Sequence, residues 1–273
     1  AIKFGLQSFT PAELTALRFL IACVPVLFLP RPNLPWLSLL VIGLTLFTGQ
    51  FLLLFFAMKF GLPPGVASIT QQIQVFFTVL LAALFLGEMP TARQSAGMGI
   101  AFAGLAVIGA TIDAELTWLG LTLGLAGALS WAVGNVLLKR NPGVPMLPLV
   151  VWLSLVPPLP ALAVSLFAGD GSLITAVAGA SWTSLASAFY LGALATVAAF
   201  ALWGRLLARY SAAQVAPFSL LVPCAGTVGS WLAFGETFGV WRYVGMALIL
   251  LGVAVAALPF SWLTSLQRAA ART

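Results

Sequence analysis

The sequence predicts an all-α integral membrane protein in which two repeats of five transmembrane helices have opposite orientations. Three observations support this prediction: a shortage of charge, long uncharged runs, and motifs that recur in both halves. Only 7% of the 273 residues are charged, against about 25% in ordinary soluble domains. Apolar residues make up 62%, and the mean hydropathy is +1.11. A soluble fold of this size needs more polar residues to cover its surface, so that class is excluded.

The composition also excludes several kinds of active site. The chain contains no His, and its two cysteines, Cys23 and Cys224, lie inside apolar runs. A His-ligated metal site, a Ser-His-Asp triad and a disulfide scaffold are therefore ruled out. We expect no cofactor and no metal ion. Despite a pI near 10.0, we expect no nucleic-acid partner, because the basic residues are scattered between apolar runs.

Uncharged runs divide the chain into nine predicted membrane spans. A spanning helix needs about 20 mainly apolar residues. Eight charge-free intervals contain at least 19 residues, and a ninth run holds Arg18 near its start. Such continuous runs favour helices over the alternating strands of a barrel. The predicted helices cover residues 12–30, 34–58, 63–86, 92–111, 117–138, 146–168, 182–206, 212–234 and 240–259.

Proline and glycine mark the joints between these helices. They break helical hydrogen bonding or adopt turn conformations, so clusters of them indicate loops. The interval 171–204 begins with a polar, Gly-rich lead-in up to Ser181, so we expect one helix there rather than two. The clearest joints are Pro30-Arg31-Pro32, Gly61-Leu62-Pro63-Pro64, Asn141-Pro142-Gly143 and Gly169-Asp170-Gly171.

The basic residues predict which joints face the cytoplasm. Alternate joints, together with the C-terminal tail, hold eight Lys or Arg residues against one acid, Glu88. The remaining joints hold three basic and four acidic residues. The positive-inside rule therefore places the first set and the C-terminus in the cytoplasm. The opening residues, Ala1 to Gly5, read as the end of a helix, so we expect another helix to precede them.

The second half of the chain repeats the first. With the expected first helix, each half has five spans, and an odd number gives the halves opposite orientations in the membrane. We divide the repeats at 1–113 and 114–273. The aligned motifs, at an offset of 148 residues, are Leu86-Gly87-Glu88 with Phe234-Gly235-Glu236, Gly97 with Gly245, and Gly104 with Gly252; near an offset of 136, Lys3 aligns with Lys139.

These duplicated motifs, together with Ala1-Ile2-Lys3-Phe4-Gly5, Pro11 and Leu17-Arg18-Phe19, resemble the drug/metabolite transporter superfamily, in particular its EamA-like ten-helix branch. The resemblance covers essentially the whole chain. It implies a 5+5 inverted-repeat fold, cytoplasmic termini and export of small metabolites, commonly amino acids, across a bacterial inner membrane. The sequence departs from the family in lacking its first helix, which usually carries a Trp-Gly-Ser-type motif.

Polar residues within the spans predict where a substrate would bind. Buried polar groups are unfavourable in hydrocarbon, so they usually face the bundle interior or a water-filled cavity. Their densest cluster lies on helix 63–86, where Gln71, Gln74 and Thr78 share one face. The amides would hold the polar end of a substrate, and the aromatic rings would cover an apolar side chain. The predicted cavity is lined by Gln50, Gln71, Gln74, Trp131, Asn135, Phe218 and Ser219, the last being the repeat mate of Gln71.

Structural alternatives remain for these residues. The amides can hydrogen-bond neighbouring helices, and Trp131 can be a packing residue. Glu13 and Arg18 lie at the outer start of a helix, and we expect them to form a local ion pair. Phosphate substrates would need Lys or Arg buried at mid-span, and we expect none. Proton coupling stays open, because no acid lies deep in the nine spans and the expected first helix could hold one.

The sequence therefore predicts a secondary transporter or facilitator that exports small metabolites by alternating access. Aromatic or other apolar amino acids suit its neutral amides and rings. One alternative is a multidrug or lipophilic-cation exporter, which would need an intramembrane acid. Another is an integral-membrane enzyme, which would need Asp, His, Ser-Lys or Cys groups clustered at one depth. The expected partners are a small-molecule substrate and membrane lipid; the oligomeric state is left open, and a monomer is compatible with the sequence.

The opposite orientation of the repeats can be tested by cysteine labelling. In cells expressing Gly239→Cys, a membrane-impermeant thiol reagent should react from outside, because the 236–242 joint is predicted to face out. Thr91→Cys, in the 88–93 joint, should react only after the cells are opened. Labelling of both cysteines in intact cells would contradict the predicted topology.

Overall fold

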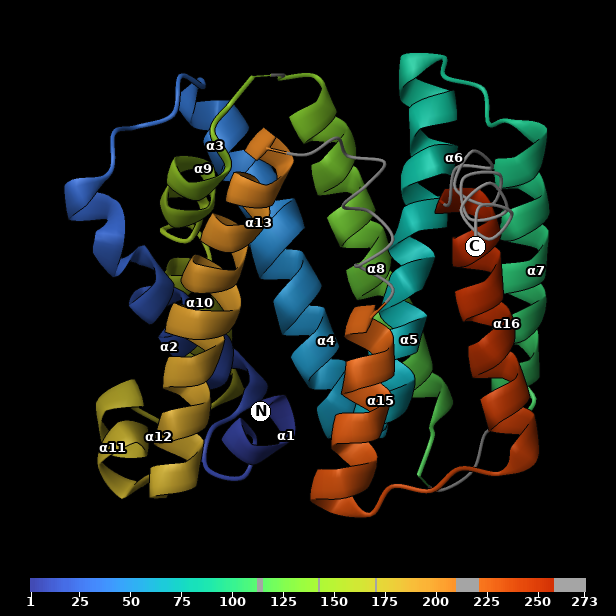
Figure 1. Ribbon diagram of the computed structural model, residues 1–273. Helices are drawn as coiled ribbons and strands as arrows, with labels where there is room; N and C mark the ends of the chain where they lie inside the picture. The colour runs from blue at the N-terminus through green and yellow to red at the C-terminus, as the bar shows by residue number, and fades with distance from the viewer. Residues whose placement is uncertain (112–114, 142, 170, 210–220, 258–273) are drawn as a thin grey trace, which may run out of the picture.

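The computed structural model describes residues 1–273 except 112–114, 142, 170, 210–220 and 258–273. All regular structure in these described residues is helical (Figure 1). By length and composition, six helices could cross a membrane: Pro11–Phe28, Trp36–Lys59, Pro64–Leu86, Trp118–Lys139, Met146–Ala168 and Trp182–Leu206. Ala92–Gly109, Leu221–Phe234 and Val240–Ala257 supply the three remaining predicted spans. The predicted all-α membrane fold is confirmed.

The first half begins with the short helix α1 (Ile2–Gly5) and continues through four spans, three of which change helical type along their length. These spans are α2 (Pro11–Cys23) with η1 (Val24–Phe28); α3 (Trp36–Ile42) with η2 (Gly43–Gly49) and α4 (Gln50–Lys59); α5 (Pro64–Thr70) with η3 (Gln71–Ile73) and α6 (Gln74–Leu86); and α7 (Ala92–Gly109).

The second half supplies five spans, of which 212–234 is described from Leu221 onward. The predicted helix 146–168 is divided, because Pro157 and Pro158 have no backbone N–H to donate. The lead-in 171–181 is partly helical. The elements are α8 (Trp118–Lys139); α9 (Met146–Leu153) and α10 (Pro158–Ala168); α11 (Leu173–Gly179); α12 (Trp182–Phe189) with η4 (Tyr190–Ala198) and α13 (Ala199–Arg209); α15 (Leu221–Phe234); and α16 (Val240–Ala257).

Side-chain caps and glycines set the ends of several helices. Thr10 and Glu13 form a capping box at the start of α2, where the Glu13 carboxylate accepts from the Thr10 N–H at 2.8 Å. Glu13 is thus engaged at its own helix end, and the predicted ion pair between Glu13 and Arg18 is wrong. The repeat mates Gly87 and Gly235 follow the C-terminal ends of α6 and α15. Their φ angles are +68° and +63°, in the left-handed region that favours glycine.

The repeat extends to an unusual local geometry. Both η2 and η4 are π-helical, and they are mates at the 148-residue offset. In η2, the Thr48 hydroxyl donates to the Gly43 carbonyl, five residues earlier, at 3.3 Å. In η4, the Thr196 hydroxyl donates to the Leu191 carbonyl at 2.7 Å. Single π segments within α-helices are frequent at functional sites.

The two repeats meet most closely where α7 crosses α16, which lie side by side at one edge of the molecule (Figure 1). A β-carbon on Gly97 would lie 2.5 Å from the Gly252 carbonyl oxygen, and one on Gly104 would lie 2.6 Å from that of Gly245. Gly97 therefore faces the repeat mate of Gly104, and Gly104 faces the repeat mate of Gly97. This reciprocal, antiparallel contact relates the helices by an approximate two-fold axis, and small residues allow such close approach.

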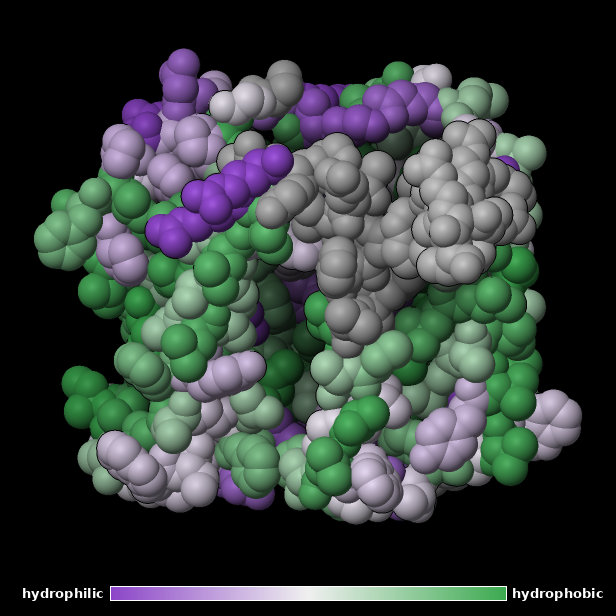
Figure 2. Space-filling model, viewed as in Figure 1, coloured by the Kyte–Doolittle hydropathy of each residue, from purple (hydrophilic) through white to green (hydrophobic). Residues whose placement is uncertain are grey.

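The surface has the distribution expected of a multi-pass membrane protein. Apolar residues cover the middle of the visible face, and hydrophilic residues gather at its upper and lower edges (Figure 2). Large apolar side chains such as Leu84 and Phe167 are exposed, the latter by 93%. In water this exposure would be unfavourable, whereas lipid tails solvate it. Inside, buried apolar residues from both halves form shared clusters that include Phe55, Phe76 and Ile249.

We expect Gly97→Leu to reduce the yield of folded protein, because its side chain would push α7 away from the α16 backbone. Overpacking of this kind destabilises by about 1–3 kcal/mol or more. Size-exclusion chromatography and thermal unfolding in detergent measure the effect. Gly99→Leu is the matched control, since a β-carbon there meets no atom within 4 Å. Equal yield and stability of the two variants would contradict this role of the crossing.

Candidate substrate cavity

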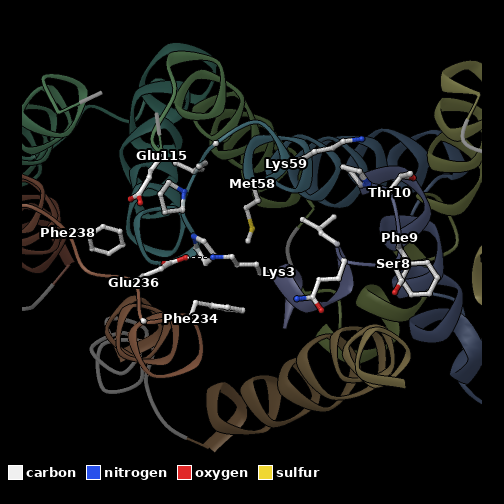
Figure 3. A pocket seen from close by; sticks show the side chains of 18 of the residues that line it. Lys3, Ser8, Phe9, Thr10, Met58, Lys59, Glu115, Phe234, Glu236 and Phe238 are labelled. Atoms are coloured by element: carbon white, nitrogen blue, oxygen red, sulfur yellow. Dashed lines mark hydrogen bonds and ion pairs between the residues drawn. The ribbon is translucent and has the colours of Figure 1, made fainter. Parts of the chain in front are cut away.

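A cavity of about 820 Å³, which we call the vestibule, opens at the end of the molecule that carries Glu236. Its wall combines α1 and the following loop, the loop between α4 and α5, and the loop after α15. Figure 3 looks into it: Lys3 lies at its centre and reaches towards Glu236, with the ring of Phe234 alongside. The polar and charged lining residues are Lys3, Gln7, Ser8, Thr10, Lys59, Glu115, Glu236 and Thr237.

An ion pair between the repeats crosses the vestibule. Lys3 Nζ lies 3.0 Å from a Glu236 carboxylate oxygen and 4.4 Å from the centroid of the Phe234 ring. The other carboxylate oxygen of Glu236 accepts from the Gly65 backbone N–H at 3.2 Å. The Glu236 side chain is only 11% exposed. This pair therefore ties the start of the first half to the joint between α15 and α16 in the second.

The same connection recurs at the opposite end of the molecule, with the roles of the repeats exchanged. Lys139, at the end of α8, pairs with Glu88, in the joint between α6 and α7. Lys139 is the repeat mate of Lys3, and Glu88 is that of Glu236. Both side chains are about half-exposed, at 50% and 49%. The fold thus places one inter-repeat Lys–Glu pair at each end.

A second cavity, of about 640 Å³, lies deeper in the molecule, and we call it the central cavity. It adjoins the vestibule, since Lys3, Met58, Pro64 and Phe234 line both. Figure 2 shows the corresponding face hollowed between α13 and α15. The lining residues with polar side chains are Lys3, Ser68, Gln71, Tyr190 and Ser230; the apolar ones include Leu54, Met58, Leu191 and Phe234.

Helices of opposite repeats form one wall of this central cavity. α5 packs against α15, where the Ser68 hydroxyl donates to the Pro223 carbonyl at 3.3 Å. Pro223 lies in α15 and Ser68 in α5, so this bond joins the two halves. Gly226 allows the approach, because a β-carbon there would lie 2.6 Å from the Ser68 β-carbon. The cavity is therefore built at the interface of the repeats.

Two of the predicted site residues form a chain of amides at the cavity wall. Gln50 Nε2 donates to Gln71 Oε1 at 2.8 Å, and Gln71 Nε2 donates to the Gly124 carbonyl at 2.9 Å. Gln71 lines the central cavity, whereas Gln50 is buried behind it. Gln50 Oε1 has no hydrogen-bond partner among the described residues. These bonds fix both amides, which leaves Gln71 positioned against the cavity.

Three other predicted residues lie away from both cavities, Gln74 on α6 and Trp131 and Asn135 on α8. The 3₁₀ turn Gln71–Ile73 separates Gln71 from Gln74, whose Oε1 accepts from Asn135 Nδ2 at 3.3 Å. Asn135 also donates to Thr78 at 3.2 Å. Trp131 packs against Phe47 and Phe51, with ring centroids 6.5 and 6.2 Å away. None of Gln74, Trp131 and Asn135 lines the vestibule or the central cavity. Phe218 and Ser219 lie outside the described residues.

Arg18 has a different environment from the one the sequence suggests. Its side chain is buried within the span Pro11–Phe28 and donates from both Nε and Nη2 to the Thr196 hydroxyl, at 3.1 and 3.0 Å. Its guanidinium also lies 3.8 Å from the centroid of the Phe51 ring. The expectation that no Lys or Arg is buried within a span is therefore wrong. The local sequence gave no signal for this contact, since Thr196 lies 178 positions away.

The described residues offer hydrogen-bond donors and acceptors, but no cluster of metal ligands. In the part of the chain that the structure covers, no three His, Cys, Asp or Glu side chains come together to hold a metal ion. The sequence pattern aligns Lys3 with Lys139, but the site predicted from it includes neither residue. Their position beside Glu236 and Glu88 could have been anticipated, because each duplicated Lys has a duplicated Glu of opposite charge.

Several known proteins are similar to this chain over nearly its whole length. A "Probable amino-acid metabolite efflux pump" of Salmonella typhimurium (strain LT2) is 38% identical over 262 residues, or 93% of this chain and 88% of the relative. A protein of Escherichia coli (strain K12) with the same description is 36% identical, covering 96% and 90%. A "Probable terminal-alkyne amino-acid exporter" of Streptantibioticus cattleyicolor is 30% identical, covering 93% and 86%.

The fold and the family model agree with these similarities. A crystal structure of a protein 22% identical to this chain superposes with a TM-score of 0.63, covering 92% of this chain and 90% of the other. At that identity the likeness concerns the fold alone. The model of the EamA-like transporter family matches residues 1–110 and 118–258. Because these matches take in most of the sequence, the chain belongs to the EamA-like transporter family.

Proposed function

We propose that this protein is a secondary transporter that exports amino acids, in particular those with aromatic or other apolar side chains, by alternating access. The observation that carries the proposal is the position of the central cavity. It lies between inverted repeats, with one inter-repeat ion pair at each end of the molecule. Inverted repeats that rock against each other around a site at their interface are the usual architecture of alternating access.

The lining of the central cavity supports a small substrate with one polar and one apolar part. Its volume of about 640 Å³ lies within the range of about 300–1,000 Å³ typical of small-molecule sites. Gln71, Ser68 and Ser230 provide neutral hydrogen-bonding groups, whereas Leu54 and Phe234 provide apolar contact. The names of the relatives, which include amino-acid efflux and amino-acid export, favour amino acids among such substrates.

Five of the seven residues predicted from the sequence are retained in the proposed site, with different roles; Phe218 and Ser219 lie outside the described residues. Gln71 faces the substrate, and Gln50 holds the Gln71 amide through its Nε2 group. Gln74 and Asn135 form a second polar pair towards the Glu88 end, and Trp131 supports the aromatic cluster around Phe51. We place the substrate first at Gln71, because that residue lies on the wall of the central cavity.

The alternatives receive less support from the described residues. A lipophilic-cation exporter would favour an acid within the spans, but the buried charge near mid-span is the cation of Arg18. A fixed positive charge in a low-dielectric region repels a cationic substrate. Glu13 is also buried, yet its carboxylate caps its own helix.

We also propose a bacterial inner membrane location, with the Glu88 end and the C-terminus on the cytoplasmic side.

The two ion pairs would act as alternate closures of the pathway. Each pair joins one repeat to the other, so the repeats must separate at that end before a substrate can pass. Lys3, Lys139 and Glu88 are each about half-exposed, and ion pairs with such solvent-exposed partners contribute about 0.2–1 kcal/mol, which thermal motion readily overcomes. Conformations that interconvert during transport differ by only a few kcal/mol. Weak, paired closures of this kind fit a cycle in which neither end is permanently open.

We expect the two closures to have opposite effects when broken. With Cys23 and Cys224 replaced by Ser, Ser68→Cys reports access to the central cavity by a membrane-impermeant thiol reagent. Glu236→Gln should raise labelling from outside roughly 1.5- to 5-fold, and Glu88→Gln should lower it, because each change favours opening at its own end. Lys59→Gln is the matched control, since it removes a vestibule charge that has no ion-pair partner among the described residues. Shifts in the same direction for both Glu variants would contradict alternate closure.

Flux measurements test the proposed function and the role of Gln71 together. In proteoliposomes, the purified protein should accelerate movement of phenylalanine above that of empty vesicles. Gln71→Ala should weaken apparent affinity roughly threefold to tenfold, since a hydrogen bond contributes about 0.5–1.5 kcal/mol and more with a charged group. Gln74→Ala, which lies off the cavity wall, should weaken it less. No flux of any amino acid by folded protein would refute the function; equal effects of the two variants would refute the placement of the site.

A further inference from the structure

Arg18 is a buried charge inside a membrane span. It lies seven residues after Pro11, about 10 Å along the helix, and its side chain is 4% exposed. An ionisable side chain within the hydrocarbon region is unfavourable by several kcal/mol unless it has a partner. An ionisable residue at such a position usually has a functional role, and the groups that contact it indicate which role.

Among the described residues, the partners of Arg18 are all neutral. The guanidinium donates to the Thr196 hydroxyl and stacks on Phe51, and it lies 5.4 Å from the centroid of the Phe19 ring. Within the described residues, no carboxylate pairs with it, because the buried Glu13 caps its own helix. The hydroxyl group accepts two of the guanidinium's hydrogen bonds and the aromatic face attracts its charge, but neither group carries the negative charge that would neutralise it.

The repeat carries no charge at the position that corresponds to Arg18. At the offset of 136 residues, the counterpart of Arg18 is Ser154, which is fully buried and donates to the Val150 carbonyl at 2.7 Å. The two crossings are similar but not identical: Gly192 of η4 packs on the Arg18 backbone, and Gly43 of η2, one position away from the mate of Gly192, packs on the Val156 side chain. A similar crossing between the halves is thus built with a small neutral residue, Ser154, at the position that corresponds to Arg18.

The edge of Arg18 that faces Thr196 is the one that binds carboxylates in other proteins. The Nε and Nη2 groups form one edge of the guanidinium, which binds two oxygens of a carboxylate in parallel. Here a single hydroxyl oxygen receives both groups, at 3.1 and 3.0 Å. Because hydrogen bonds to an ionised acceptor are roughly twice as strong as neutral ones, a carboxylate would compete effectively for this edge.

The π segment η4 connects this edge to the central cavity. Its first residues, Tyr190 and Leu191, line the cavity, and its Thr196 holds Arg18. The Thr196 hydroxyl also donates to the Leu191 carbonyl at 2.7 Å. The residue that lines the cavity and the residue that holds Arg18 therefore lie on one hydrogen-bonded turn. A shift of η4 during the transport cycle would therefore move the cavity wall and uncover the guanidinium together.

We infer that Arg18 recognises the carboxylate of the transported molecule, which takes the place of the Thr196 hydroxyl at the Nε–Nη2 edge as the substrate passes. This inference rests on the proposed function and deepens it, because it makes a free carboxylate the required chemical group of the substrate. Arg18 is then a specificity-determining residue that one half supplies and the other half does not.

The test compares a substrate with its carboxamide. Phenylalanine and phenylalaninamide compete against labelled phenylalanine in proteoliposomes, and the ratio of their inhibition constants measures carboxylate preference. The wild-type protein should prefer phenylalanine, and Arg18→Gln should lower that ratio roughly tenfold to a hundredfold. Arg18→Lys, which keeps the charge but not the planar edge, should lower it less. Ser154→Ala, the change at the repeat mate, should leave the ratio unaltered.

Binding to the wild-type protein provides a test that does not depend on variant folding. Phenylalanine should raise the Tm of detergent-purified protein more than phenylalaninamide does at equal concentration. Equal Tm shifts, or an unchanged inhibition ratio in folded Arg18→Gln, would overturn the role of Arg18. Carboxylate-dependent binding without flux of any amino acid would instead refute the proposed function and leave the role of Arg18 standing.

Discussion

The close crossing of α7 and α16 is the contact on which the rest of the structure depends. Four glycines bring the two backbones together, and each glycine faces the mate of the other. The crossing fixes the repeats in opposite directions around one axis. A motif near a helix end that occurs in both repeats therefore appears once at each end of the molecule. The Lys–Glu pairs follow from this constraint: Lys3 meets Glu236 at one end, and Lys139 meets Glu88 at the other.

Features that occur in both halves suit the conformational cycle, whereas a feature that occurs in only one half suits the binding of the substrate. The ion pairs, the π segments with Thr48 and Thr196, and the left-handed glycines all occur in both halves. A molecule that closes alternately at two ends needs equivalent devices at both. A small chiral substrate has no such symmetry, so its binding groups must differ between the halves. Arg18 and its mate Ser154 differ in this way.

The sequence predicted the spans and their pairing because both depend on simple quantities. Length and hydropathy determine which runs cross the membrane, and duplicated motifs reveal the repeats. Contacts inside the bundle were harder to predict. The 3₁₀ turn after Thr70 separates Gln71 from Gln74, and apolar periodicity does not report that change of helical type. The pairing of Glu13 with Arg18 was wrong, because the capping box at Thr10 engages Glu13 and Thr196 lies far along the chain.

Burial further distinguishes the charges at the ends from the charge in the middle. Lys139 and Glu88 are half-exposed, so water replaces their contact when they part, and little free energy is lost. Glu236 is more enclosed, yet it lines the vestibule, and its partner Lys3 is 45% exposed. Arg18 has no such replacement, because hydrocarbon and aromatic rings surround it. It must keep a polar partner throughout the cycle, and exchange of one oxygen acceptor for another meets that requirement while a substrate is held.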